Sequence, residues 1–211
     1  ALVKASFRSA SRPKGKRLAS RGLGSWGSGP FELYIEPHFE EDVELVEVAV
    51  PETVSRYHPL VKEFSKDREW SYVSVEAQPR ASRVLQAIVN EALRRGYEVR
   101  APDVSERQAY RSRTRRDRFA IATQDGSFTV QIREIPKTGG AKLEYRTWNA
   151  RKTRPSWVEQ RGHEFIPTGH LELTLQGVRG YGDATYRDAR THQLEDRLGV
   201  LFHDLEVSRL Y

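Results

Sequence analysis

The chain contains neither cysteine nor methionine among its 211 residues. Without cysteine it can form no disulfide bond, thiolate nucleophile or sulfur-bound zinc site. No run of 18 apolar residues is present, and no basic segment precedes an apolar stretch as in a secretory signal. These absences favour a soluble cytoplasmic protein that has no membrane partner.

Apolar residues are also scarce, at 37%, whereas charged residues reach 30%. Residues 1–30 contain seven Lys or Arg and no acid, so this stretch alone exceeds the net charge of +6. A segment this rich in Ser, Gly and cations cannot bury enough apolar surface to offset the entropy of ordering it. We therefore expect a disordered basic arm over residues 1–30 and a single domain over residues 31–211.

Hydrophobic spacing predicts the elements of that domain. Apolar residues recur at helical spacing between Gln78 and Gly96, and again in a final helix that starts within 186–190 and runs to about Leu210. A short helix is expected within 53–64. Alternation of apolar and polar residues predicts the strands, which fall in 31–50, 70–75, 97–99, 118–135 (a hairpin turning at Asp125-Gly126), 143–145 and 171–175. This order predicts an α+β fold, an antiparallel sheet with the two main helices packed on one face.

Three basic clusters are candidates for contact with nucleic acid, in the first place DNA. Cations packed this densely repel one another unless an anion lies between them, and basic arms reach phosphates or a minor groove. The clusters are the arm (Arg8, Arg12, Lys14, Lys16, Arg17), a central run beside Tyr110 (Arg111, Arg113, Arg115, Arg116, Arg118), and a patch near Trp148 and Trp157 (Arg151, Lys152, Arg154).

Each cluster also has a structural explanation. The arm could be a solubilising tail, and the central run could be a solvated loop before the hairpin. The two tryptophans could stack on unpaired bases or could anchor a long loop to the core. Composition alone does not choose between these alternatives.

The evidence for catalysis is weaker. Asp125, Glu134 and Lys137 resemble the acids and lysine of a metal-dependent nuclease, but Glu134 and Lys137 are three residues apart and so lie on opposite faces of a strand. His163 and His170 flank a Pro-Thr-Gly turn and could converge there. No two histidines have the helical spacing of a zinc site. We expect no catalytic residue, metal or cofactor, although a hydrolase or nuclease remains the third hypothesis.

The second hypothesis is a protein-interaction or oligomerisation domain. Residues 31–50 contain seven acids and no Lys or Arg. An acidic cluster in this stretch could meet a basic partner or the chain's own arm (Glu40, Glu41, Asp42, Glu44).

The C-terminal part of the chain resembles an uncharacterised bacterial domain often found after a helix-turn-helix-like region. The resemblance rests on the stretch His163–Leu173, an aromatic–x–Pro-Thr-Gly–x–Leu–x–Leu strand, and on Gln193–Gly199 with its Leu-Glu-Asp–x–Leu-Gly helix entry. Tyr186 stands where the pattern has Trp. No activity comes with this resemblance. It implies association with DNA-binding architecture, by analogy.

Overall fold

The computed structural model describes residues 15–22, 31–66, 73–102, 118–136, 145–146, 164–165, 167–178 and 183–211. Five strands form one antiparallel sheet whose spatial order, β3-β4-β5-β8-β9, follows the chain. Their bounds are β3 (Glu98–Arg100), β4 (Arg118–Ala122), β5 (Ser127–Glu134), β8 (Leu171–Gln176) and β9 (Ala184–Arg187). Two short strands, β6 (Tyr145–Arg146) and β7 (Glu164–Phe165), pair separately.

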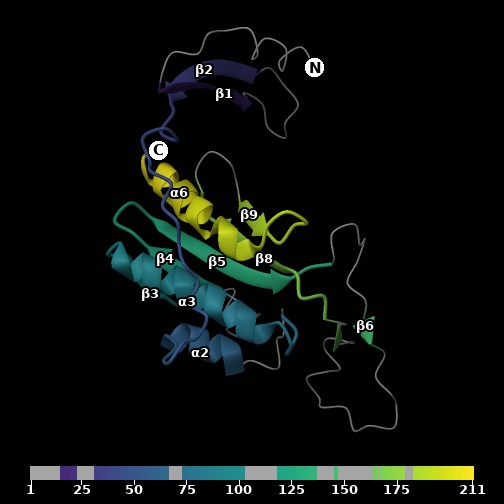
Figure 1. Ribbon diagram of the computed structural model, residues 1–211. Coiled ribbons are helices and arrows are strands. Elements are labelled where there is room, and N and C mark those ends of the chain that lie inside the picture. Colours follow the sequence, from purple (N-terminus) through teal and green to yellow (C-terminus); the bar gives the residue numbers. More distant parts are fainter. Residues whose placement is uncertain are drawn as a thin grey trace, which may run out of the picture.

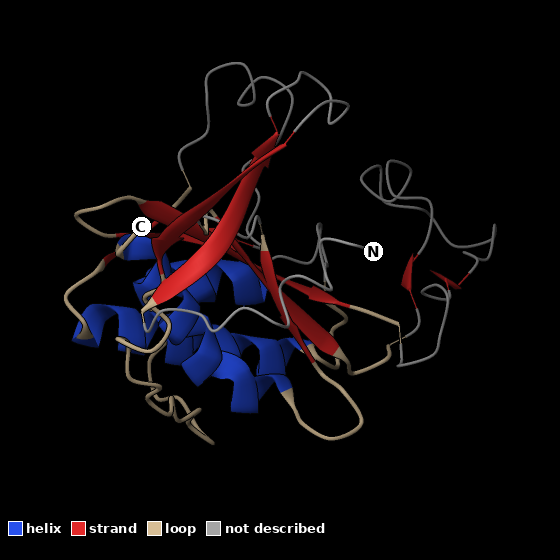
Figure 2. Ribbon diagram, turned by 90° about the horizontal axis from the view of Figure 1, so that it is seen from above, coloured by secondary structure: helices blue, strands red, loops and turns tan. Residues whose placement is uncertain are grey.

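Helices cover one face of the five-stranded sheet (Figures 1 and 2). They are α2 (Pro59–Lys66), α3 (Gln78–Arg94) and α6 (Leu198–Arg209), the last entered through a 3₁₀ turn, η2 (Leu194–Arg197). The α+β class, the antiparallel sheet and the placement of both main helices on one face are as expected from sequence. None of these helices, over the described ranges, could span a membrane.

The core lies between the sheet and the helices. On β5 the alternate residues Phe128, Val130 and Ile132 are buried, whereas Thr129 and Gln131 between them are only partly buried. The leucines predicted to form the apolar stripe of the last helix are all fully buried, as are three leucines of β8 (Leu194, Leu198, Leu201, Leu205, Leu171, Leu173, Leu175). Strand alternation thus directs one row of side chains to the helices and the other row to the opposite face.

Several expected elements differ. Residues 184–187 form an edge strand, so the last helix begins later than 186–190, at the 3₁₀ turn. Val73 and Val75 lie in a bend and turn before α3, not in a strand. The hairpin is confirmed, but its connection is a four-residue loop in which Thr123 binds the Gly126 carbonyl, and Gly126 does not have a positive φ. Both the backbone N–H and the hydroxyl of Thr123 donate to the Gly126 carbonyl and close this loop, whereas the sequence predicts a tight turn at Asp125-Gly126.

A second, smaller unit precedes the domain. Strand β1 (Lys16–Gly22) pairs in antiparallel register with β2 (Phe31–Pro37). The sequence reasoning predicted β2 but not β1, which lies within the expected arm. Residues 38–50, here called the strap, then run along α6 without forming the second predicted strand.

Close contacts hold the strap to α6. The ring of His203 contacts the Glu40 carbonyl at 3.0 Å, and Val48 enters the core. A Cβ on Gly199 would lie 2.6 Å from the backbone oxygen of Val46, so only glycine allows this approach. The strap therefore fixes where the β1–β2 hairpin leaves the domain.

Candidate nucleic-acid interface

The face of the sheet opposite the helices is polar, and we call it the polar face. Directly paired residues share a face, so the register sorts its residues into rows across the strands. One row joins Arg133, Glu172 and Arg187 across β5, β8 and β9. A second row joins Arg118, Gln131, Thr174 and Thr185, and a third joins Arg100, Ala120, Thr129 and Gln176. The described positions of the polar face contain no aromatic residue.

Four arginines of the polar face gather toward one end of the sheet. Arg118 begins β4, Arg133 is the next-to-last residue of β5, and Arg187 ends β9 beside the start of β8. Arg100 ends β3 and pairs with Ala120, two residues along β4 from Arg118. In Figure 1 this is the end at which the arrowhead of β5 lies. Four strands therefore deliver a guanidinium to the same region.

Two long connections join the sheet at that same end. Residues 101–117 link β3 to β4, and residues 135–170 link β5 to β8. These connections contain the predicted central run and the predicted tryptophan-flanked patch. Both connections thus leave the sheet at the end where the four arginines lie, and the basic residues of the predicted run and patch, apart from Arg118 at the start of β4, lie outside the described residues.

One predicted site residue with a described side chain, Arg118, lies on the polar face, where it is partly buried. Lys16 is exposed at the start of β1, and Arg17 follows it on the same strand. The remaining predicted site residues lie outside the described residues (Arg8, Arg12, Lys14, Arg111, Arg113, Arg115, Arg116, Arg151, Lys152, Arg154). Sequence reasoning did not select Arg100, Arg133 and Arg187. The alternation along β5 nevertheless indicates that Arg133 lies on the polar face, because it is two residues from Gln131 and alternates with the buried residues of the strand.

Arg133 and Arg187 differ in how strongly they are held. Arg133 donates to one oxygen of the Glu172 carboxylate, at 2.7 Å from Nε and 2.5 Å from Nη2. Its side chain remains 57% exposed, whereas that of Glu172 is only 6% exposed. Arg187 is exposed on the edge strand, opposite Glu172 in register. A polyanion approaching this face would therefore reach Arg187 without first breaking a short ion pair.

On the helix side several arginines bind carboxylates. Arg80 of α3 reaches both oxygens of Asp188 at 2.7 and 2.8 Å, those of Glu195 at 2.7 and 2.5 Å, and the Gly169 carbonyl at 2.9 Å. Burial raises the pKa of Asp188, but Arg80 and the N–H groups of Leu171 and Leu194 outweigh it and hold the pKa below its usual value. This cluster ties α3, β9 and the entry of α6 together.

Glu134, the acid of the suspected nuclease pattern, is a buried structural residue. Its carboxylate accepts the N–H groups of Ser74, Thr168 and Gly169 at 2.8, 2.5 and 2.8 Å, and the Thr168 hydroxyl at 3.0 Å. Burial opposes its ionisation, but these donors outweigh burial and keep the pKa of Glu134 below its ordinary value. Gly169 has a φ of 71°, which suits glycine in this turn. The Pro-Thr-Gly motif thus supplies hydrogen-bond donors to the buried carboxylate of Glu134.

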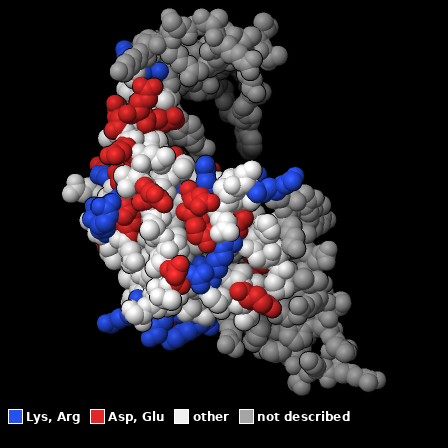
Figure 3. All heavy atoms as spheres, in the orientation of Figure 1, with Lys and Arg blue, Asp and Glu red and all other residues white. Residues whose placement is uncertain are grey.

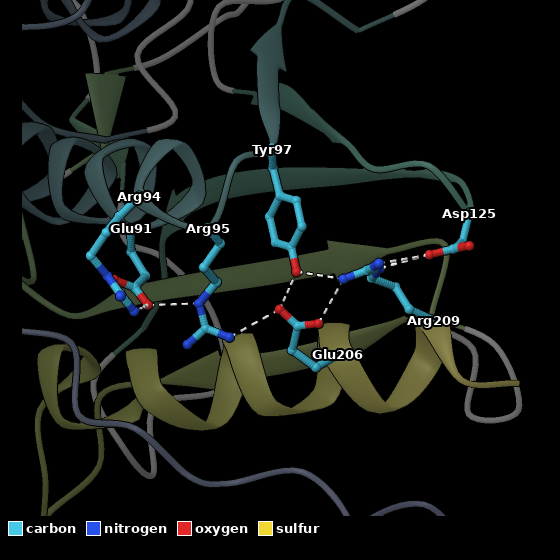
Figure 4. Close-up of polar contacts among 7 residues, drawn as sticks. All are labelled: Glu91, Arg94, Arg95, Tyr97, Asp125, Glu206 and Arg209. Carbon is cyan, nitrogen blue, oxygen red and sulfur yellow. Dashed lines mark hydrogen bonds and ion pairs between the residues drawn. The ribbon is translucent and has the colours of Figure 1, made fainter.

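A third ionic network joins the ends of α3 and α6 to the β4–β5 turn (Figure 4). Arg95 bridges Glu91 at 2.6 Å and Glu206 at 3.0 Å. Arg209 binds the Glu206 carboxylate at 2.9 Å, the Tyr97 hydroxyl at 2.7 Å and Asp125 at 2.9 Å. Tyr97 donates to Glu206, and burial followed by this carboxylate raises the pKa of Tyr97 to about 12.

Charge is accordingly balanced on the helix side. Figure 3 shows Lys and Arg intermixed with Asp and Glu over the face that carries the helices. Within the described part of the chain, no three His, Asp or Glu side chains are grouped as a metal site would require. His163, the suggested partner of His170, lies outside the described residues. Among described features, the polar face is thus where basic side chains from several strands gather.

Comparison of the chain with family models, curated proteins and solved structures found no match.

Proposed function

We propose that the protein is a non-enzymatic nucleic-acid-associated module, in the first place for DNA, that contacts the phosphate backbone through one end of its polar face. The observation that carries this proposal is the convergence of Arg100, Arg118, Arg133 and Arg187 where both basic connections join the sheet. The folded domain positions these cations, and phosphates would contact Arg187 and the exposed part of Arg133 at this end of the sheet.

The chemistry of the polar face favours contact with phosphates over stacking on bases. Single-stranded nucleic acid is bound largely by aromatic side chains on which bases stack. The described positions of the polar face offer arginine, glutamine, threonine and serine instead, beside two acids, Glu98 and Glu172. Arginine, glutamine, threonine and serine bind phosphate oxygens, which position a nucleic acid but carry no sequence information. Binding should therefore tolerate changes of sequence.

The experiment is a salt titration of binding to a generic duplex. Each phosphate neutralised contributes about −0.9 to the slope of log K against log salt, so the intact chain should show a steep fall. Arg187→Gln should weaken binding to all sequences alike and reduce the slope by about one. The matched control is Arg56→Gln, another exposed arginine that lies outside the sheet, and it should leave the slope unchanged.

Two results would count against the proposal. Absence of binding at low salt would remove it altogether. Equal loss of slope in the Arg187 and Arg56 variants would show that net charge, and not the polar face, governs the interaction.

A further inference from the structure

Glu172 is an acid placed between two arginines of the polar face. It pairs in register with Arg133 of β5 on one side and with Arg187 of β9 on the other. Its side chain is only 6% exposed, so little of its carboxylate reaches solvent. A buried negative charge thus occupies the middle of a row whose two outer positions are candidates for contact with phosphate.

The two arginines beside Glu172 differ in how far their charge is available. Arg133 donates from both Nε and Nη2 to a single carboxylate oxygen of Glu172, at 2.7 and 2.5 Å. Arg187 is exposed at the end of the edge strand. The charge of Arg133 is therefore neutralised within the fold, although more than half of its side chain faces solvent.

This ion pair bears directly on the attraction of a polyanion. The salt dependence of binding counts the phosphates that Lys and Arg neutralise, and a guanidinium already bound to a carboxylate contributes little to that count. The carboxylate itself repels phosphate oxygens. We infer that Glu172 restrains the binding of nucleic acid to the polar face by neutralising Arg133. This inference rests on the function proposed above and assigns a regulating residue to the same site.

The ion pair also fixes the orientation of the Arg133 guanidinium, which would favour binding, because a side chain already held in place loses less entropy on contact. Burial of Glu172 decides between the two effects. Salt screens a buried charge much less than an exposed one, so the repulsion from this carboxylate persists where that from a surface acid would fade. Removal of the charge should therefore strengthen binding.

The test is Glu172→Gln in the salt titration of the full chain on a generic duplex. The amide keeps the size of the side chain and removes its charge, so Arg133 becomes able to neutralise a phosphate. The variant should bind more tightly than the parent at low salt, and its slope should be steeper by about 0.9, the contribution of one phosphate. Between 50 and 200 mM salt it should lose about 3.5-fold more affinity than the parent.

Glu98→Gln is the matched control, because it removes the same charge from the same face. Glu98 is an exposed acid that begins β3, in the register row that ends at Ser127. Ser127 and Arg133 lie near opposite ends of β5, about 20 Å apart. Because the Debye length in 0.1 M salt is about 10 Å, this variant should leave the slope unchanged.

A second variant links the effect to Arg133. Adding Arg133→Gln to Glu172→Gln should remove the gain in affinity and slope, because the cation that the first substitution frees is then absent. Circular dichroism checks that each variant is folded. If glutamine is not tolerated, Glu172→Thr repeats the residue that already occupies the same face of β8 at Thr174.

Arg187→Gln, titrated alongside, separates this inference from the proposed function. If Arg187→Gln lowers the slope but Glu172→Gln does not raise it, the restraint by Glu172 is wrong and the proposed function stands. Equal gains in Glu172→Gln and Glu98→Gln would assign the effect to net charge and overturn the inference. Weaker binding by Glu172→Gln at the parent slope would overturn it as well, and absence of binding by the parent chain would remove both proposals.

Discussion

The two sides of the five-stranded sheet use arginine in opposite ways. On the helix side Arg80, Arg95 and Arg209 each bind carboxylates from other elements, and these ion pairs neutralise their charges and stabilise the fold. On the polar face the exposed charge of Arg187 lies on an edge strand, and Arg133 stays largely exposed beside its partner. The number of arginines therefore indicates little about function, whereas the face on which each arginine lies indicates whether its charge is paired within the fold or exposed.

The largest expected difference between the two sides of the sheet comes from two adjacent residues, Arg187 at the end of β9 and Asp188 directly after it. Asp188→Ala removes one of the two carboxylates that bind Arg80 and leaves the N–H groups of Leu171 and Leu194 without an acceptor. Breaking a buried pair of this kind should lower the free energy of unfolding by about 3–5 kcal/mol. Arg187→Ala should change it by less than about 0.5 kcal/mol. Urea denaturation measures both, and similar losses would contradict the comparison.

Glu134→Gln should be the next largest change, costing about 2–3 kcal/mol near neutral pH because a charged acceptor is lost. The pKa of Glu134 is lowered in the folded state, so its contribution is complete above the unfolded value of about 4.3. It is lost as the pH falls through the folded-state pKa. Unfolding free energy measured from about pH 7 to pH 3 should therefore fall less steeply in the variant.

An unchanged acid dependence in Glu134→Gln would mean that other carboxylates govern it. Asp188 shifts in the same direction, so the flattening should be partial.

Gly199→Ala tests the close packing of the helix side. Alanine ordinarily stabilises a helix relative to glycine by roughly 0.5–1 kcal/mol. Here its Cβ would meet the Val46 oxygen at 2.6 Å, so the strap must shift, and we expect a net loss of about 1–2 kcal/mol. Gly126→Ala is the control, because a Cβ there meets nothing within 4 Å. Stabilisation by Gly199→Ala would show that the strap yields freely.

Tyr97→Phe should have the smallest effect on the helix side. It removes one hydroxyl from between Glu206 and Arg209, which still bind each other, so the loss should be about 1 kcal/mol. Thr185→Val on the polar face should change stability by less than about 0.5 kcal/mol. Thermal unfolding of both variants would show whether removal of a single hydroxyl costs more stability on the helix side than on the polar face.

Local patterns predicted the main elements but not their long-range contacts. The apolar repeats gave α3, the stripe of α6, the β4–β5 hairpin and β8, because burial of one face imposes the spacing. Tyr186 was assigned to a helix start, since a four-residue edge strand leaves too short an alternation to recognise. Strand β1 was missed because its pairing with β2, and not its own composition, makes it a strand.

The candidate site shows the same limit. Arg118 was selected as part of a dense run, which is a local signal. Its neighbours Arg133 and Arg187 come from strands that the register brings together, and no local window contains them. Glu195 lies in the Leu-Glu-Asp stretch on which the resemblance rests, but only its contact with Arg80 shows that it joins the entry of α6 to α3.

The lateral strands of the sheet have a bearing on how the protein behaves when concentrated. Strand β3 spans only Glu98–Arg100 and strand β9 only Ala184–Arg187, and exposed charged residues lie on both. Short edge strands with charged side chains offer another molecule few unpaired backbone groups, which is how natural sheets resist fibre formation. Growth of amyloid-like fibres through the edges of this sheet should accordingly be disfavoured.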